Sequence, residues 1–307
     1  MSIIVVLILF AVLFMACVTA VLLAIGPIML LQPHRRTVDY YRRYTSILEP
    51  SDLDLPCEPL SIATDDGITL SGWLIRAAEP KGTVFYLHGV SECKIVGLPM
   101  AKMLHDRGFH VFLYDSRRHG ESGGSFCTYG YYEKRDASKV MDVVSSLAGF
   151  EPGKIALFGS SMGAAVAIQV AALDKRVVAL VAESGFATLR TVFDDYQRRM
   201  IKLPWHYLRN IVIKRSEHLA GFKANAVSPL EAVREVHVPI FILHGTADDR
   251  IASGYSEMVY GNANPPKQLW LIEGARHGDM AEVGGADYYE RIGRFFEDAL
   301  GPPAPLS

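Results

Sequence analysis

Six short, nearly continuous apolar runs alternate with helix-like stretches, and this alternation limits the fold most strongly. Runs of this kind are typical of parallel strands buried on both faces of a sheet. They are TVFYLHG, HVFLYD, KIALFG, VVALVAE, PIFILHG and KQLWLIE. Two further runs, PLSIAT and ITLSGWLIRA, flank Asp65, Asp66 and Gly67 and predict a hairpin. We therefore expect an α/β fold with a mostly parallel sheet of about eight strands and helices on both faces.

The N-terminus carries a second strong signal. No charged side chain lies between Ile3 and Leu31, and the stretch exceeds the roughly 20 apolar residues that cross a bilayer as a helix. We expect one membrane span that Gly26 and Pro27 kink or end, because proline removes a helical hydrogen bond. A cleaved signal peptide is the alternative, but nothing basic precedes the run and it is long for a signal core.

Basic residues follow the apolar run directly, and no Lys or Arg precedes it. The positive-inside bias therefore predicts that the rest of the chain is cytoplasmic, with an extracytoplasmic location as the alternative. The basic residues are Arg35, Arg36, Arg42 and Arg43.

The chain divides into a transmembrane anchor (1–31), a juxtamembrane linker (32–57), a globular domain (58–300) and a loose tail (301–307). The anchor is expected to act only as a tether, so a chain beginning near Thr37 should be soluble and active.

Composition narrows the range of partners. A net charge of -2 gives no support to nucleic-acid binding, which is typical of strongly basic domains. The sequence contains neither His-Glu-x-x-His, nor Gly-x-Gly-x-x-Gly after a strand, nor a phosphate loop, so we expect no metal, nucleotide or flavin cofactor. The four cysteines are scattered without a Cys-x-x-Cys pair, which favours a reducing compartment. They are Cys17, Cys57, Cys93 and Cys127.

Two Gly-x-Ser-x-Gly matches compete for the role of nucleophile. Ser161 lies directly after the run KIALFG and before an alanine-rich, helix-like stretch. A sharp strand-to-helix turn would hold its hydroxyl at the carboxyl edge of the sheet, and Gly159 and Gly163 permit that strained turn. Ser122 follows its strand only after a polar segment and precedes a loop, so we interpret its match as a chance turn. Ser161 is the predicted nucleophile.

A serine hydroxyl needs a base to act as a nucleophile at neutral pH. His277, in the segment LIEGARHGDM, follows the last apolar run within a Gly-bearing loop, from which an imidazole reaches over the sheet edge. His88 and His244 also end strands, in two LHG segments, and we interpret them as buried structural histidines. His277 is therefore the predicted base.

An acid that orients the base should lie between serine and histidine in chain order. Asp248 and Asp249 come just after the strand-like run PIFILHG. We prefer Asp248, with Asp249 as the alternative, while Glu183 at the end of VVALVAE is a third option.

Acyl transfer also needs donors for the negative oxygen of the tetrahedral intermediate. Two backbone N–H groups are expected to form this oxyanion hole. One belongs to Met162, directly after the nucleophile, and the other to Val90, directly after the His88-Gly89 pair.

In combination these motifs resemble the α/β-hydrolase superfamily, and within it the membrane-anchored serine hydrolases and the bacterial hydrolases of the serine-aminopeptidase-like group. The resemblance implies an α/β-hydrolase fold, a triad of Ser161, Asp248 and His277, and a structural loop without a nucleophile at RRHGESGG. The usual D-x-x-V-P after the acid reads D-D-R-I-A here, so both aspartates remain candidates. The matching segments cover about residues 56–299: TDDGITLSGWLI, YLHG, YDSRRHGESGG, YGYYEKRDA, FGSSMGA, SPLEAVREVHVPIFILHGTADDRI and GARHG.

The resemblance further implies hydrolysis by double displacement. Ser161, deprotonated by His277, would attack an acyl carbonyl, and water would then release the acid from the acyl-enzyme. We expect a carboxylic ester of a small molecule or lipid as substrate. A peptidase or a thioesterase on the same triad is one alternative, and a non-catalytic, membrane-tethered binding module is another.

An insertion at about 186–236, which we call the cap, exceeds the usual length of a strand-to-helix connection. In the hydrolases that the chain resembles, an insertion here covers the serine and shapes the acyl pocket, so its aromatic and aliphatic residues predict a hydrophobic acyl group. The alternative is that these side chains only pack the cap onto the domain. Cations of the insertion, among them Arg198, Arg199 and Lys202, are expected either to face solvent or to bind anionic lipid.

Overall fold

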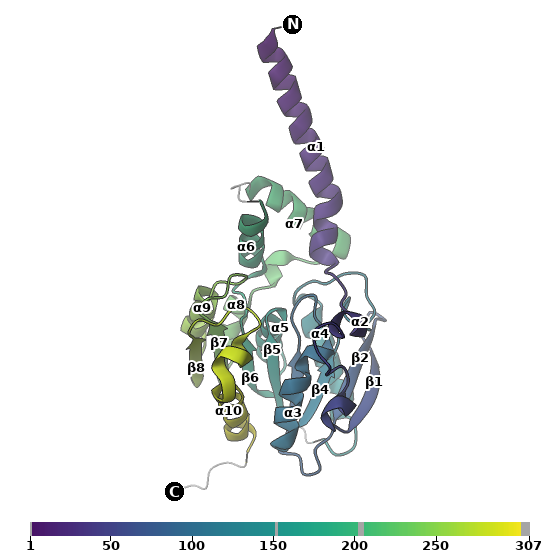
Figure 1. The fold of residues 1–307 in the computed structure, drawn as a ribbon, viewed down its shortest axis with the longest axis vertical. Coiled ribbons are helices and arrows are strands. Elements are labelled where there is room, and N and C mark those ends of the chain that lie inside the picture. Colours follow the sequence, from purple (N-terminus) through teal and green to yellow (C-terminus); the bar gives the residue numbers. More distant parts are fainter. Residues whose placement is uncertain (1, 151–152, 202–205, 302–307) are drawn as a thin grey trace.

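The computed structural model describes residues 2–150, 153–201 and 206–301. Its centre is an eight-stranded sheet in the order β1-β2-β4-β3-β5-β6-β7-β8 (Figure 1). The pairs β1–β2 and β2–β4 are antiparallel, and all other neighbouring pairs are parallel. The predicted mostly parallel sheet is confirmed. The strands are β1 Cys57–Ala63, β2 Thr69–Ile75, β3 Thr83–Leu87, β4 His110–Tyr114, β5 Ile155–Ser160, β6 Val177–Glu183, β7 Ile240–Gly245 and β8 Lys267–Ile272.

Helices cover both faces of the sheet, which explains why its central strands are apolar along their whole length. Every residue of β3, β4 and β7 is buried. On one face the core contains side chains of α4 (Glu133–Ser145), α5 (Met162–Leu173) and α9 (Gly254–Asn262). On the other face it contains side chains of α3 (Leu98–Asp106) and α10 (Met280–Leu300). The shorter helices are α2 Val38–Tyr41 and α8 Pro229–Ala232, with 3₁₀ turns at Pro50–Leu53, Lys94–Gly97, Ala224–Ala226 and Val233–Glu235.

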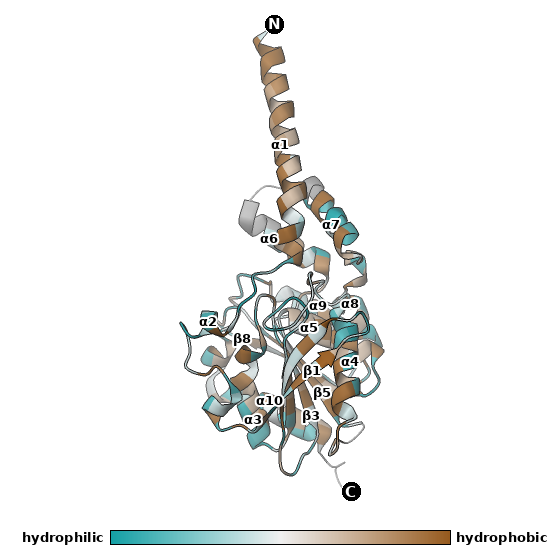
Figure 2. Ribbon diagram, turned by 90° about the vertical axis from the view of Figure 1, so that its right-hand side faces the viewer, coloured by the Kyte–Doolittle hydropathy of each residue, from teal (hydrophilic) through white to brown (hydrophobic). Residues whose placement is uncertain are grey.

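The N-terminal apolar run forms one helix, α1, over Ile3–Leu31. It projects from the body of the protein, and its exposed length is hydrophobic (Figure 2). The helix is long and apolar enough to cross a membrane, which is consistent with a single-pass anchor. We expected the helix to kink or end at Gly26 and Pro27. It does not end there, because α1 continues through Pro27 to Leu31.

The last turns of α1 pack onto the body of the protein. Gly26, Pro27 and Leu31 are buried, and Leu31, only 1% exposed, belongs to the main hydrophobic core. This burial contradicts the expectation that the apolar run acts only as a tether. A chain beginning near Thr37 would lack this core side chain, and its solubility and activity remain a prediction.

Two helices of the insertion, α6 (Leu189–Ile201) and α7 (His206–Ala220), lie between the sheet and the projecting part of α1 (Figure 1). Leu189, Val192 and Phe193 of α6 and Ile213 of α7 are buried in the same core as Leu31. The side chains of Arg198, Arg199 and Lys202 lie outside the described residues, so the expectation about these cations remains a prediction.

Candidate active site

Ser161 occupies the sharp turn between β5 and α5. Its φ is 55° and its ψ is −114°, a conformation that costs energy for a residue with a side chain. The turn closes only because of its two glycines: a Cβ at Gly159 would lie 2.2 Å from the carbonyl oxygen of Gly163. A Cβ at Gly163 would lie 2.0 Å from that of Leu87, at the end of β3. The turn therefore holds Ser161 at the carboxyl edge of the sheet.

His277 lies between Ser161 and Asp248 and is hydrogen-bonded to both. Its Nε2 is 3.1 Å from Ser161 Oγ, and its Nδ1 is 2.7 Å from Asp248 Oδ2. Since the carboxylate can only accept, Nδ1 is the donor and Nε2 is left to accept from the serine hydroxyl. The structure thus brings the three residues selected from the sequence into one hydrogen-bonded chain. A base oriented in this way can take the proton of an attacking serine.

Asp248 is the acid that faces His277, while Asp249 is exposed. The side chain of Asp248 is fully buried, and its Oδ2 also lies 3.1 Å from His244 Nε2. Burial alone would raise the pKa of Asp248, but hydrogen bonds from His244 and His277 outweigh it and hold the pKa below its ordinary value. Asp248 is therefore ionised at neutral pH and favours a positive charge on His277.

His244 has a contact with the acid that sequence reasoning missed. Its Nε2 donates to Asp248 and to the carbonyl of Ile251, so its Nδ1 accepts from the Ser256 hydroxyl at 2.7 Å. The ring is fully buried. The one available signal was its position four residues before Asp248 at the end of a strand, which does not by itself predict this contact.

The other candidates considered from the sequence have structural partners. Ser122 is buried, accepts from the Ser71 N–H at 2.9 Å and donates to the carbonyl of Asp115. His88 is buried and accepts from the Ser116 N–H at 2.9 Å through Nε2. Both side chains fix loops at the sheet edge rather than face His277.

Glu183 points away from His277 toward α10. Its carboxylate accepts from the Ser160 hydroxyl at 2.9 Å and from the Tyr288 hydroxyl at 2.5 Å. Burial raises the pKa of this carboxyl above its usual range. The backbone carbonyl of Glu183 accepts from the Ser161 N–H at 2.7 Å, so the residue supports the nucleophile turn from behind.

The two backbone segments expected to form the oxyanion hole lie side by side. Met162 is the first residue of α5, and the first N–H groups of a helix have no partner within it. The loop carrying Val90 begins at Gly89, where a Cβ would lie 3.2 Å from Ser161 Cβ. Donors on both segments would therefore border the space beside Ser161.

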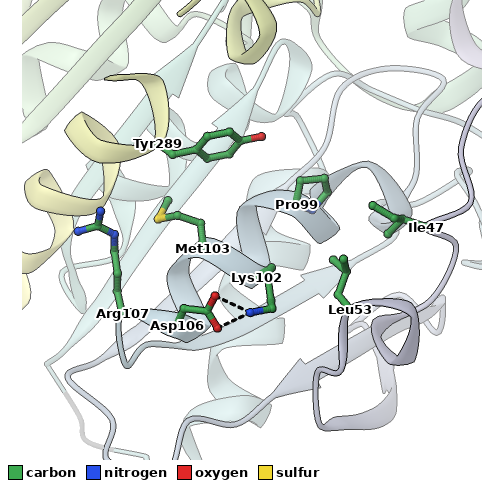
Figure 3. A pocket seen from close by; sticks show the side chains of 8 residues that line it. All are labelled: Ile47, Leu53, Pro99, Lys102, Met103, Asp106, Arg107 and Tyr289. Atoms are coloured by element: carbon green, nitrogen blue, oxygen red, sulfur yellow. Dashed lines mark hydrogen bonds and ion pairs between the residues drawn. The ribbon is translucent and has the colours of Figure 1, made fainter. Parts of the chain in front are cut away.

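Two hollows lie on the α3 and α10 side of the site. A cavity of about 210 Å³ is lined by Ser160, Glu183 and Gly278, next to the nucleophile and the base. A larger surface hollow, about 650 Å³, lies on the outer side of α3 (Figure 3). Pro99 and Tyr289 border both hollows. Among the described residues there is no cluster of three His, Cys, Asp or Glu side chains suited to a metal ion.

Comparison with known proteins agrees with the fold described above. Residues 78–229 match the model of the family described as "Serine aminopeptidase, S33". The esterase Pf2001 of Pyrococcus furiosus is 26% identical and superposes with a TM-score of 0.72, over 88% of this chain and 100% of the esterase chain. The uncharacterized protein YqkD of Bacillus subtilis is 28% identical over 76% of each chain.

A third relative is the 2,6-dihydropseudooxynicotine hydrolase of Paenarthrobacter nicotinovorans. It is 26% identical over 70% of this chain and 56% of its own length. Two of these three proteins thus have stated activities, an esterase and a hydrolase, and the esterase superposes on most of this chain. From its fold, its family match and these relatives, the chain belongs to the α/β-hydrolase superfamily.

Proposed function

We propose that the chain is a serine hydrolase that cleaves carboxylic esters through an acyl-enzyme. The observation that supports this most is the hydrogen-bonded chain from Ser161 Oγ through His277 to the buried carboxylate of Asp248. The esterase activity named for Pf2001 of Pyrococcus furiosus, which this chain resembles at 26% identity, adds support.

The reaction proceeds in two halves. Ser161 Oγ forms a bond to the acyl carbon as its proton passes to His277 Nε2, and the ionised Asp248 stabilises the resulting imidazolium. His277 returns the proton to the leaving alcohol as the ester bond breaks. Water then gives a proton to His277 and attacks the acyl carbon; His277 returns the proton to Ser161 Oγ as the acyl–Oγ bond breaks, which releases the carboxylic acid. The N–H groups of Met162 and Val90 bind the negative oxygen in both halves.

The cap favours a hydrophobic acyl group. The Phe193 ring of α6 contacts the Tyr129 ring edge-on at a centroid distance of 5.5 Å, close to the nucleophile turn. Both rings are buried in the core that also contains Met162. An acyl chain bound to Ser161 Oγ that extends toward the cap would meet apolar side chains, which are a favourable environment for alkyl groups.

A graded substrate panel tests the proposal. We expect the full-length protein to hydrolyse 4-nitrophenyl esters, with a rate that rises from acetate to longer acyl chains. Ser161→Ala should lose several orders of magnitude in turnover, as removal of a triad member commonly does. Faster cleavage of the matched thioester or aminoacyl 4-nitroanilide would contradict the ester assignment and favour a thioesterase or a peptidase. A folded protein that cleaves none of them would favour a binding module.

We also propose that α1 is a single-pass anchor and that the hydrolase domain faces the cytoplasm. Cys57 is exposed at the start of β1, Cys93 and Cys127 are buried, and the other exposed cysteine, Cys17, lies within α1. A membrane-impermeant maleimide should therefore label Cys57 in disrupted cells and not in intact cells. Equal labelling of intact cells would show the opposite orientation.

A further inference from the structure

The end of α1, the segment Gly26–Leu31, is bound to the hydrolase body by backbone hydrogen bonds. We call this segment the foot. The carbonyl of Leu31 accepts from the Cys127 N–H at 2.8 Å, and the carbonyl of Leu30 accepts from the Tyr129 hydroxyl at 2.7 Å. Carbonyls at a helix end have no intrahelical partner, so these contacts fix the foot in place.

The foot reaches close to the candidate active site. Cys127, which binds the Leu31 carbonyl, has its Sγ 3.5 Å from Sδ of Met162, the residue after the nucleophile. Tyr129, which binds the Leu30 carbonyl, stacks edge-on against Phe193 of the cap. One layer of side chains therefore separates the membrane helix from the nucleophile turn.

The foot also packs tightly against the cap helix α7. A Cβ at Gly26 would lie 2.8 Å from a methyl carbon of Val212, so only glycine allows this approach of the two helices. Val212 is 9% exposed and cannot move easily aside. Foot, α6 and α7 thus form one unit above the sheet, as the two views agree (Figures 1 and 2).

The length of the free helix puts this unit at the membrane surface. The part of α1 without buried residues, Ile3–Ile25, reaches about 34 Å at 1.5 Å per residue, and the hydrocarbon core is about 30 Å thick. A helix of this length would therefore lie almost wholly within the bilayer, and the foot would lie at the membrane surface.

Two exposed cations of the cap lie near the foot. Lys214 and Arg215 of α7 are a turn or less from the Val212 contact, and neither forms an ion pair within the part of the chain that the structure describes. Each cation near an anionic surface contributes about 1 kcal/mol of attraction. These two side chains would therefore favour an anionic leaflet beside the foot.

We propose that the substrate is a long-chain carboxylic ester resident in the bilayer, which Ser161 reaches at the membrane surface where the foot and the cap hold the site. This inference rests on the proposed function and names its substrate class. The acyl group passes to Ser161 Oγ, the alcohol leaves with the proton from His277, and water then releases the fatty acid. Because the cap is fixed at the headgroup level, the scissile ester of such a lipid need not leave the interface to react.

The test compares ester in the enzyme's own membrane with ester in a separate one. The full-length protein is reconstituted in phosphatidylcholine–phosphatidylglycerol vesicles, and 4-nitrophenyl palmitate is placed either in the same vesicles or in protein-free vesicles. We expect turnover at least about tenfold faster for ester in the same vesicles, equivalent to about 1.4 kcal/mol. Equal rates from both sources would overturn the inference.

A variant pair tests the role of the foot. Gly26→Leu should lower the ratio of palmitate turnover in the same vesicles to turnover of soluble 4-nitrophenyl acetate, because the new side chain separates α1 from Val212. Ala11→Leu, on the exposed part of α1, adds the same side chain and should leave the ratio unchanged. A ratio unchanged in Gly26→Leu would contradict a guiding role for the foot.

A cross-link keeps the test decisive if Gly26→Leu does not fold. The Cβ position of Gly26 is 3.5 Å from Val212 Cβ, within the roughly 3.5–4.5 Å that a disulfide requires. The double variant Gly26→Cys and Val212→Cys should form an intramolecular disulfide on oxidation and retain palmitate turnover in its own vesicles. Failure to cross-link would show that the foot is not docked. Loss of palmitate turnover on cross-linking, with acetate turnover retained, would show that access requires the foot to leave.

The acetate substrate distinguishes failure of the proposed ester hydrolysis from failure of the proposed bilayer substrate. If the wild-type protein cleaves neither ester, the proposed function fails. If it cleaves acetate through Ser161 but takes palmitate equally from both vesicle populations, the ester hydrolase stands and the bilayer route is wrong.

Discussion

Buried His119, which packs against His88, lowers the stability of the protein in acid. The His119 ring meets the His88 ring edge-on at 5.1 Å, and its Nδ1 donates to the Arg117 carbonyl at 2.9 Å. Its buried Nε2 has no hydrogen-bond partner among the described residues. Burial, the neighbouring His88, and Arg35 and Arg118 lower the pKa of His119 to about 3.

This low pKa predicts a loss of stability on acidification. Between pH 6.5 and 3 the unfolded chain binds a proton at His119 and the folded protein does not, so stability is complete above pH 6.5 and falls as the pH decreases. The loss is at most about 1.4 kcal/mol per pH unit. We expect the melting temperature of His119→Asn, whose amide can still donate to Arg117, to fall less from pH 7.5 to pH 5 than that of the wild type. Parallel pH profiles would contradict this account.

At the residue scale, the sequence allowed the three site residues to be predicted but not the side chains that contact them. Ser161, His277 and Asp248 could be selected because each lies in the turn or loop that follows a strand, and parallel strands end at one edge. The contact of His244 with Asp248 and that of Cys127 with Met162 could not, because they depend on side-chain directions after packing. Neither residue type in isolation indicates such a neighbour.

At the scale of elements, the turn between β5 and α5 depends on the absence of a side chain at Gly163. A Cβ there would lie 2.0 Å from the Leu87 carbonyl oxygen and 2.9 Å from that of His88, both in backbone that cannot give way easily. We expect Gly163→Ala to displace Ser161 and to lower ester turnover by about 100-fold or more, since small displacements of reacting groups have effects of that size.

Gly261 in α9 offers the matched control. A Cβ at Gly261 would meet no atom within 4 Å, and alanine is favoured over glycine within a helix by about 1 kcal/mol. Gly261→Ala should therefore keep full turnover and melt at the same or a higher temperature. Equal activity of the two alanine variants would show that the close contact at Gly163 does not position the nucleophile.

Among the elements, the strands could be predicted because their burial on both faces leaves a plain apolar pattern. The end of α1 could not. Proline at position 27 indicated a break, but the turn after it is fixed by hydrogen bonds from Cys127 and Tyr129 to the carbonyls of Leu31 and Leu30. Contacts from a distant segment thus extend the helix beyond its local signal.

At the scale of the whole molecule, the anchor and the enzyme share one core. Leu31 is 1% exposed and lies in the core cluster with residues of the sheet, of α5 and of the cap. We expect Leu31→Ala to destabilise the protein by about 2–5 kcal/mol, as buried leucine truncations do. Leu13→Ala, which removes the same atoms from a side chain 64% exposed to the surroundings of α1, should have little effect.

Thermal unfolding of both variants in one detergent makes the comparison. A large fall in melting temperature for Leu31→Ala alone is the expected result. Equal melting temperatures would show that the foot contributes nothing to the stability of the hydrolase body, and a chain beginning near Thr37 would then be a sound soluble enzyme.

Whether Ser161 is the nucleophile is tested by the site at which a fluorophosphonate probe attaches to the folded, full-length protein. We expect one adduct, found by peptide mass spectrometry on Ser161, which is absent in Ser161→Ala and present in Ser122→Ala. Ser122→Ala should lower the melting temperature only, because it removes two buried hydrogen bonds. An adduct on Ser122, or a folded wild-type protein that forms none, would contradict the assignment of Ser161 as the nucleophile.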